Sequence, residues 1–152
     1  MPLNQNGLRA IALTIVFAAL AGCATTPTPA YEDREQAVSA QDLAILDGAD
    51  AILAAEADWN RHDTRECPPG ATSFSLFCAL QKASTDVLGV YDHRRAALQE
   101  VRFAVEDATK GREFEHRLMD FNNLPETRFS DIKRILAAAK ARVTARLGAA
   151  SR

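Results

Sequence analysis

The chain has 152 residues, with 18 Lys and Arg against 20 Asp and Glu, and its formal net charge is −2 at pH 7. This length fits one folded domain. The charge is too small to predict nucleic acid as a partner, and it does not indicate an acidic interaction tail.

The first part of the chain has the three regions of a secretory signal. Arg9 is the only charged side chain in residues 1–9, residues 11–20 are almost entirely apolar, and Ala21 and Gly22 are small. A basic start, a short apolar run and small residues before a cut site are typical of an export signal. The apolar run is about half as long as the roughly 20 residues of a membrane-spanning helix, so we do not expect a permanent transmembrane helix.

The end of this signal, Leu20-Ala21-Gly22-Cys23, resembles the lipobox of bacterial lipoproteins. The resemblance implies that the Cys23 thiol carries a diacylglyceryl group, that the signal is cut before Cys23, and that the new amino group is acylated. Two or more acyl chains hold a protein stably on a bilayer. In this class Asp after the cysteine signals retention in the inner membrane, so Ala24 favours the outer membrane, with the domain facing the periplasm. An ordinary signal peptide with a cysteine nearby by accident is the alternative.

The predicted organisation has three parts: a signal peptide over residues 1–22, a lipidated cysteine with a flexible tether over residues 23–31, and a single helical domain over residues 32–152. The segment ATTPTPA after Cys23 has two prolines, three threonines and no large apolar residue. Such a segment cannot bury a core, and we expect it to be extended.

The sequence contains three cysteines, and lipidation of Cys23 would leave Cys67 and Cys78 as an even pair. Exported proteins meet oxidising conditions, so we predict a disulfide between Cys67 and Cys78. A redox site or a pair of metal ligands is the alternative, but neither has a CxxC spacing to support it.

Hydrophobic periodicity predicts an all-α domain, a small bundle of three or four helices. Apolar residues recur every seven positions from Val38 to Trp59, which predicts a first helix over residues 32–60. Gly48 lies within this helix, and we expect another helix to approach closely there.

Helix-breaking residues predict a loop over residues 61–72, and Ser73 is the expected N-cap of the next helix. Apolar positions then continue at helical spacing over residues 74–108. They fit either one long helix or two segments that bend at Gly89.

Residues 110–123 are open to two interpretations. Phe114 and Phe121 would share one face of a short helix, whereas the alternating residues on both sides of Lys110-Gly111 also suit a β-hairpin. We favour the helix because the helical period fits more residues.

A last helix is predicted over residues 128–147, with Thr127 or Ser130 as its N-cap and Gly148 at its end. Its polar side is basic and contains Lys133, Arg134, Lys140, Arg142 and Arg146. A cationic amphipathic helix can rest on anionic headgroups or cell-wall polymer. We favour a solvated charged face, because the apolar stripe of this helix is well formed and suits burial in the bundle.

The sequence contains no GxSxG, HExxH, P-loop or GxGxxG motif. No nucleophile with a neighbouring base and no pair of carboxylates stands out. We therefore predict a non-enzymatic protein that uses no cofactor.

A first weak binding candidate is the run His93-Arg94-Arg95 after Tyr91. Arginine offers forked donors that can hold a phosphate or a carboxylate. The interpretation we favour is that Tyr91 belongs to the core and that the arginines pair with acids on the helix surface.

A second candidate is the set Glu113, His116 and Asp120, which lie at steps of three and four and can share one helical face. Such side chains can bind a divalent metal, but a structural site needs about four ligands. We predict no metal site and favour a surface salt-bridge cluster with Arg112 and Arg117.

A third candidate is the polar stretch over residues 117–123, which ends in Asn122 and Asn123. It is a possible corner for a ligand or a partner. The alternative is that the amide side chains cap backbone groups at a helix end.

The leading functional hypothesis is a membrane-anchored periplasmic lipoprotein that binds another envelope protein or the cell wall through its helical surface. The alternative is a lipoprotein that binds a small ligand or a metal with His93, His116 and Asp120. In both cases the lipid bilayer is a partner through acylated Cys23.

Overall fold

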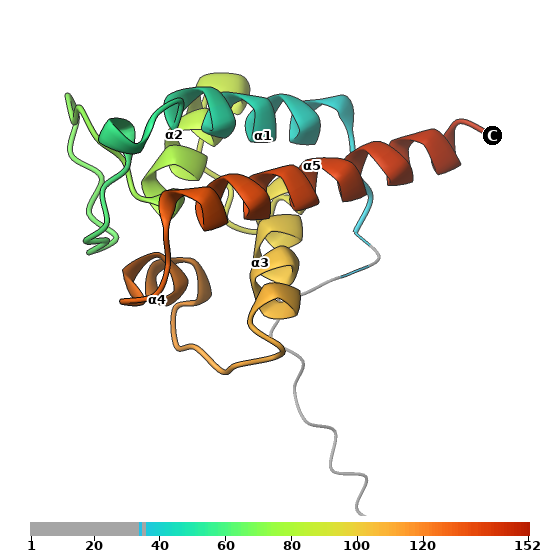
Figure 1. The fold of residues 1–152 in the computed structure, drawn as a ribbon. Helices are drawn as coiled ribbons and strands as arrows, with labels where there is room; N and C mark the ends of the chain where they lie inside the picture. Colours follow the sequence, from blue (N-terminus) through green and yellow to red (C-terminus); the bar gives the residue numbers. More distant parts are fainter. Residues whose placement is uncertain (1–33, 35) are drawn as a thin grey trace, which may run out of the picture.

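The computed structural model describes residue 34 and residues 36–152. The predicted signal peptide, the lipidated Cys23 and the tether lie outside the described residues. The described part is all-α, as predicted, but it contains five α-helices and a short 3-10 helix where three or four helices were expected (Figure 1). The elements are α1 (Ala40–Ile52), η1 (Glu56–Asp58), α2 (Leu76–Leu88), α3 (Ala96–Ala108), α4 (Arg117–Asn123) and α5 (Phe129–Ala150).

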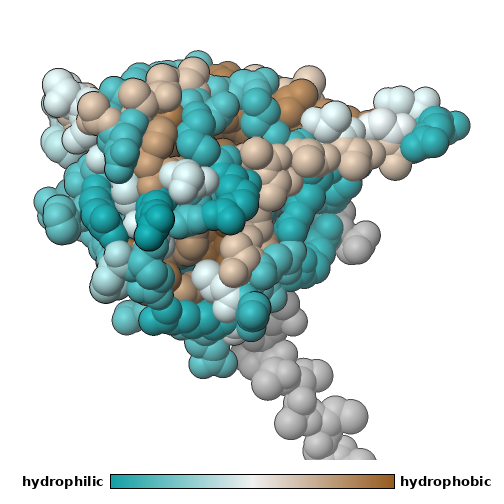
Figure 2. Space-filling view, in the orientation of Figure 1, coloured by the Kyte–Doolittle hydropathy of each residue, from teal (hydrophilic) through white to brown (hydrophobic). Residues whose placement is uncertain are grey.

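The helices enclose one apolar core. α1 packs against α2 and α5, α3 packs against α5, and α4 contacts both α2 and α3. α5 runs beside α1 in the opposite direction, and its last turns project beyond the body of the domain (Figures 1 and 2). The largest fully buried apolar side chains include Ile45, Leu46, Leu53, Leu76, Leu80, Leu98, Ile132 and Leu136.

Hydrophilic side chains cover much of the face shown in Figure 2, and apolar ones show between them and along the projecting end of α5. In the described part of the chain, no helix is long and apolar enough to cross a bilayer.

α1 begins later than the sequence pattern predicts. Ser39 is its N-cap, and the Asp42 carboxylate accepts a hydrogen bond of 2.8 Å from the backbone amide of Ser39. An acid in the first turn also interacts favourably with the helix dipole. The helix therefore starts after Ser39, and residues 36–39 are not helical.

α1 also ends earlier than predicted. Lys133 of α5 donates hydrogen bonds of 3.0 Å to the carbonyl oxygens of Asp50 and Leu53, which satisfies backbone groups at the end of α1. Trp59 is buried, as its place in the apolar pattern predicts, but it lies beyond the helix. It forms an isolated parallel β-bridge with Phe74 instead.

Two helices, α2 and α3, occupy most of residues 74–108. Gly89 ends α2 with a φ of 76°, a left-handed conformation that glycine adopts without steric cost. Of the two alternatives for this stretch, the interruption at Gly89 is the one present, and the single long helix is wrong. The N-cap of α2 is Ser75 rather than Ser73, because the Ser75 hydroxyl accepts a hydrogen bond of 3.1 Å from the Cys78 amide.

Gly48 lies where α1 meets α2, as expected. A Cβ atom at this position would lie 3.2 Å from the Cβ of Ala83. The two helices therefore pack closer here than they could with a larger side chain at Gly48.

The helix favoured for residues 110–123 is confirmed only for residues 117–123, which form α4, and the hairpin is wrong. α4 begins only at Arg117, because Lys110 and Gly111 first turn the chain with φ values of 55° and 74°. Residues 112–116 are therefore not helical, although the position of Phe114 had suggested a helix there.

α5 begins with Arg128 as its N-cap, so neither Thr127 nor Ser130 has that role. The Asp131 carboxylate accepts a hydrogen bond of 2.9 Å from the Arg128 amide, whereas the Thr127 hydroxyl donates one of 2.7 Å to the Phe121 carbonyl. Nor does Gly148 end the helix, which continues beyond it for two residues to Ala150.

Candidate functional site

Arg95 belongs to an ion pair that ties two helices together. Its Nε donates to Asp42 Oδ1 at 2.9 Å, and Asp42 is only 1% exposed. The same oxygen accepts a hydrogen bond of 3.0 Å from the Ala97 amide in the first turn of α3. The structure thus places Arg95 in the framework of the domain, while the neighbouring Arg94 is exposed.

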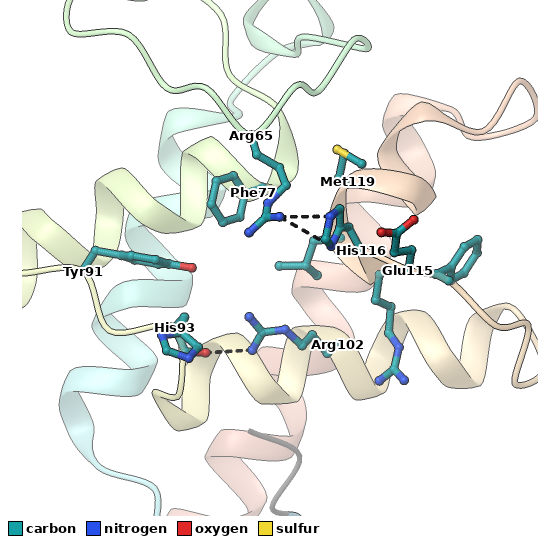
Figure 3. Close-up of a pocket in the computed structure, with 11 residues that line it drawn as sticks. Arg65, Phe77, Tyr91, His93, Arg102, Glu115, His116 and Met119 are labelled. Atoms are coloured by element: carbon teal, nitrogen blue, oxygen red, sulfur yellow. Dashed lines mark hydrogen bonds between the residues drawn. The ribbon is translucent and has the colours of Figure 1, made fainter. Parts of the chain in front are cut away.

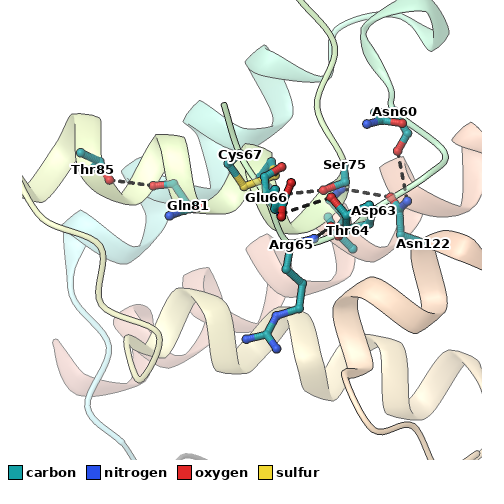
Figure 4. The surroundings of a disulfide bond; sticks show 12 residues. Asn60, Asp63, Thr64, Arg65, Glu66, Cys67, Ser75, Gln81, Thr85 and Asn122 are labelled. Carbon is teal, nitrogen blue, oxygen red and sulfur yellow. Dashed lines mark hydrogen bonds between the residues drawn. A yellow bond between two sulfur atoms is a disulfide. The ribbon is translucent and has the colours of Figure 1, made fainter. Parts of the chain in front are cut away.

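Asn122 also belongs to the framework, because its buried amide joins three segments. Its Oδ1 accepts hydrogen bonds from the Trp59 indole at 2.8 Å and from the Leu76 amide at 3.1 Å. Its Nδ2 donates to the Asn60 carbonyl at 3.1 Å. Asn122 therefore holds α4 against the loop after η1 and the start of α2 (Figure 4).

Asn123 holds the same loop at a second point. Its Oδ1 accepts a hydrogen bond of 2.7 Å from the Asp63 amide, and its Nδ2 donates one of 2.8 Å to the Asp63 carbonyl. Both asparagines of the polar stretch thus bind backbone groups of the protein itself.

Asp120 serves the N-terminus of α4. Its Oδ2 accepts a hydrogen bond of 2.8 Å from the His116 backbone amide. Among the described residues, no group of three or more His, Cys, Asp and Glu side chains is arranged to hold a metal ion. The set Glu113, His116 and Asp120 is therefore not brought together as a ligand set.

The predicted disulfide between Cys67 and Cys78 is present, with the two Cα atoms 5.4 Å apart (Figure 4). It ties the loop after η1 to the first turn of α2. Arg65 in this loop has a φ of 63°, which is uncommon for a residue with a Cβ, and its amide donates a hydrogen bond of 2.7 Å to Asp63. The disulfide and the asparagine contacts together hold Arg65 in this conformation.

Arg65 lines a cleft of about 520 Å³ between this loop, α2, α3 and α4 (Figure 3). Cavities of this size are typical of small-molecule sites. The cleft contains two of the predicted binding residues, His93 and His116, although they are far apart in the sequence. The other predicted candidates do not line it.

Two arginines enter the cleft from opposite sides. Arg65 reaches in from the loop and Arg102 from α3, and the hydroxyl of Tyr91 points into the space between them (Figure 3). Arg65 Nη1 lies 3.1 Å from His116 Nε2. Arg102 Nη1 donates a hydrogen bond of 2.9 Å to the carbonyl of His93.

Tyr91 is a neutral donor at the centre of the cleft. Burial raises its pKa above the usual 10.0, whereas the positive charges of Arg102 and Arg65 act in the opposite direction. The hydroxyl therefore keeps its proton at neutral pH and can donate it in a hydrogen bond to an anion.

The charge in the cleft is mainly positive. Arg65 and Arg102 face each other there, Arg117 lines the wall with its guanidinium paired to Glu106, and Glu115 is the acidic side chain among the described residues that line the cleft. Positive side chains in a concave site raise the local concentration of anions. The cleft is therefore suited to a phosphate or a carboxylate.

Part of the cleft wall is apolar. Phe77 of α2 packs edge-on against the Tyr91 ring, with ring centroids 5.9 Å apart. Leu118 and Met119 of α4 and the preceding Phe114 add further apolar side chains to the lining. The site thus offers cationic donors and an apolar surface next to each other.

The chain enters the domain beside this cleft. Glu106 Oε2 lies 3.0 Å from Arg34 Nη2 and 3.5 Å from Arg117 Nη1. Arg34 also lies over the Phe103 ring, with its guanidinium carbon 4.1 Å from the ring centroid. Glu106 therefore links the first described residue to a residue of the cleft.

The basic side of α5 contacts acids of its neighbours. Lys133 and Lys140 pair with acids of α1, and Arg142 and Arg146 pair with acids of α3. The hydrogen bond between Lys140 and Asp47 raises the pKa of that lysine. The favoured interpretation of a simple solvated face is therefore incomplete, because these ion pairs also join helices.

Sequence reasoning missed Arg65, Arg102 and Phe77. Arg102 and Phe77 looked like ordinary residues of an amphipathic helix. Their spacing in the sequence does not indicate that they share a site. The one available signal was the position of Arg65 two residues before a cysteine of the predicted disulfide.

Residues 37–142 match a family of unknown function, DUF6197, and the chain belongs to this family. No curated protein and no solved structure matches the chain. The comparisons therefore identify the domain and assign no activity to it.

Proposed function

We propose that this member of DUF6197 is a non-enzymatic lipoprotein of the bacterial envelope, which binds an anionic group of another envelope component in the cleft. The observation that carries this proposal is the convergence of Arg65, Arg102 and the Tyr91 hydroxyl on one space (Figure 3). Arginine and tyrosine donors in a partly desolvated site suit a carboxylate or a phosphate.

The anchor part of the proposal is supported by the lipobox resemblance at Leu20-Ala21-Gly22-Cys23. Acylated Cys23 would hold the protein on a bilayer. The favoured location is the periplasmic face of the outer membrane. The disulfide between Cys67 and Cys78 is consistent with an oxidising compartment.

Metabolic labelling with a clickable fatty acid tests the anchor. The wild-type protein should be labelled and the Cys23→Ala variant should not. Equal labelling of both proteins would refute lipidation at Cys23.

The anionic group can belong to an envelope protein or to the carboxylates of the cell wall. Site-specific photo-crosslinking in living cells tests this part. A crosslinker at Met119, on the apolar side of the cleft, should capture an envelope component, and one at the exposed Arg134 on α5 should not. The Arg65→Gln and Arg102→Gln variants should reduce capture at Met119. Capture that is unchanged in both variants would refute the role of the arginines.

A small free ligand is the second candidate. The observation that favours it is the volume of about 520 Å³ together with the apolar wall. Such a ligand would have to match both the cationic and the apolar side chains of the cleft.

A further inference from the structure

We infer that the cleft binds a small amphiphilic anion, a phosphate or carboxylate attached to an apolar group. This inference rests on the anion-binding function proposed above and adds that the ligand also has an apolar group. The feature that carries it is that the cationic and the apolar parts of one cleft adjoin: the guanidinium carbon of Arg65 lies 5.8 Å from the centroid of the Phe77 ring.

The anionic head would lie between Arg65 and Arg102, within reach of the Tyr91 hydroxyl (Figure 3). Both arginines already contact histidines of the cleft rim. A guanidinium has five N–H donors in a planar fork, so it can keep contacts within the protein and bind an oxyanion as well. The loop that carries Arg65 is fixed by the disulfide, which limits the ordering that binding requires.

The apolar group would cover the side chains that a simple anion leaves in contact with water. Phe77, Phe114 and Met119 are only half-buried, and they line the same cleft as the arginines. Covering apolar surface stabilises a complex by about 25 cal/mol per Å². A cleft of about 520 Å³ is also far larger than an inorganic phosphate needs. Both observations favour a ligand with an apolar part over a bare ion.

The position of the cleft suits a ligand that comes from a membrane. Arg34 and the cleft residue Arg117 share the carboxylate of Glu106, so the chain enters the domain beside the cleft. The ten residues between Cys23 and Arg34 reach at most about 35 Å when fully extended. A lipidated Cys23 would therefore keep the cleft within a short distance of lipid headgroups. The same chemistry also fits a free amphiphile in the periplasm.

Calorimetric titration of the full mature lipoprotein, reconstituted in phosphatidylcholine vesicles, tests the inference with three probes. Inorganic phosphate supplies only the anion, phenol supplies only the apolar ring, and phenyl phosphate supplies both. Phenyl phosphate should bind at least about tenfold more tightly than either of the other two. Vesicles without protein give the background.

Matched variants separate the two halves of the site. Arg65→Gln and Arg102→Gln should weaken both phosphate probes by about tenfold. The exposed Arg94→Gln, which removes the same charge outside the cleft, should leave them unchanged. Met119→Gln should weaken phenyl phosphate and leave inorganic phosphate unchanged. Circular dichroism of each variant shows whether it is folded.

The outcomes distinguish this inference from the proposed function. If inorganic phosphate and phenyl phosphate bind equally well through the arginines, the anion site stands and the amphiphilic ligand is refuted. If neither binds, the anion site of the proposed function and the amphiphilic ligand are both refuted, while the anchor keeps its own test. The source of the ligand follows from vesicles that contain phosphatidic acid: competition with phenyl phosphate supports a membrane lipid, and unchanged binding supports a free amphiphile.

Discussion

Replacing Asn122 with alanine would remove one amide that connects three segments of the domain. Asn122 is completely buried, and its Oδ1 accepts hydrogen bonds from the Trp59 indole and the Leu76 amide. Its Nδ2 donates to the Asn60 carbonyl. The Asn122→Ala variant would leave these two donors and one acceptor without their partner.

The expected loss of stability follows from those three groups. A buried donor or acceptor without a partner costs about 1–3 kcal/mol. Relaxation of the neighbouring residues, or a water molecule that fills the space, would lower the total cost of the three groups. We therefore expect the Asn122→Ala variant to lose about 3 kcal/mol of unfolding free energy. Asn123→Ala is the matched control: the Asn123 side chain is exposed and contacts only the backbone of Asp63 besides Asn122, so the loss should be about 1 kcal/mol.

Urea unfolding followed by tryptophan fluorescence measures both variants. Trp59 is the only tryptophan of the chain and is itself a partner of Asn122, so its emission reports directly on this contact. The difference in midpoint, multiplied by the common slope, gives the change in unfolding free energy. Equal losses in the two variants, or a loss below about 1 kcal/mol for Asn122→Ala, would refute the reasoning.

Three further predictions concern the disulfide, a helix contact and the cleft. Reduction of Cys67–Cys78, with its sequence separation of 11, should lower stability by about 3 kcal/mol, measured by urea unfolding with and without reductant. Gly48→Val should destabilise by about 2 kcal/mol through overpacking, and adding Ala83→Gly should restore part of this loss in a thermal melt. Burial raises the pKa of Tyr91, so an ultraviolet absorbance titration should show a tyrosine that ionises above pH 10.0 and is absent in Tyr91→Phe. Because the unfolded chain then loses this proton first, stability should fall as the pH rises above 10.0, and less so in the variant.

The helical elements were predictable where a periodic apolar pattern is long. The core positions of α1 and α5 follow from the sequence alone, and the alanine-rich composition of both segments favours helix. The ends of the helices were less predictable, because partners distant in the sequence determine them. α1 stops where Lys133, 80 residues away from Leu53, reaches its last carbonyls. No local pattern around Leu53 contains that information.

Trp59 shows how a correct burial prediction can accompany a wrong element. Its seven-residue spacing from Ile52 fits a continuous helix, and its side chain is indeed in the core. The indole instead reaches the core from an extended segment, where it finds Asn122 as a hydrogen-bond partner. Periodicity predicts that a side chain is buried, but a tertiary partner decides how the backbone brings it there.

The polar residues of the site were only partly predictable for a similar reason. Asn122 and Asn123 were predicted as binding candidates because amides and acids are dense in that stretch. Both instead hold the backbone of a loop. His93 and His116 do line the cleft, but they do so together with Arg65 and Arg102. Those arginines come from a loop and a helix that only the folded chain brings together.

The framework contacts and the cleft are connected through the loop that carries Arg65. Asn123 binds the backbone of Asp63, and the disulfide fixes Cys67, so Arg65 is held from both sides. Its left-handed backbone is a conformation that an unrestrained arginine seldom adopts. Folding therefore places the Arg65 guanidinium opposite Arg102 before any ligand arrives, and a ligand need not order the loop. Reduction of the disulfide should consequently weaken the proposed anion binding with little change in helix content, because it loosens the wall of the cleft that carries Arg65 while α3 and α4 keep their own packing.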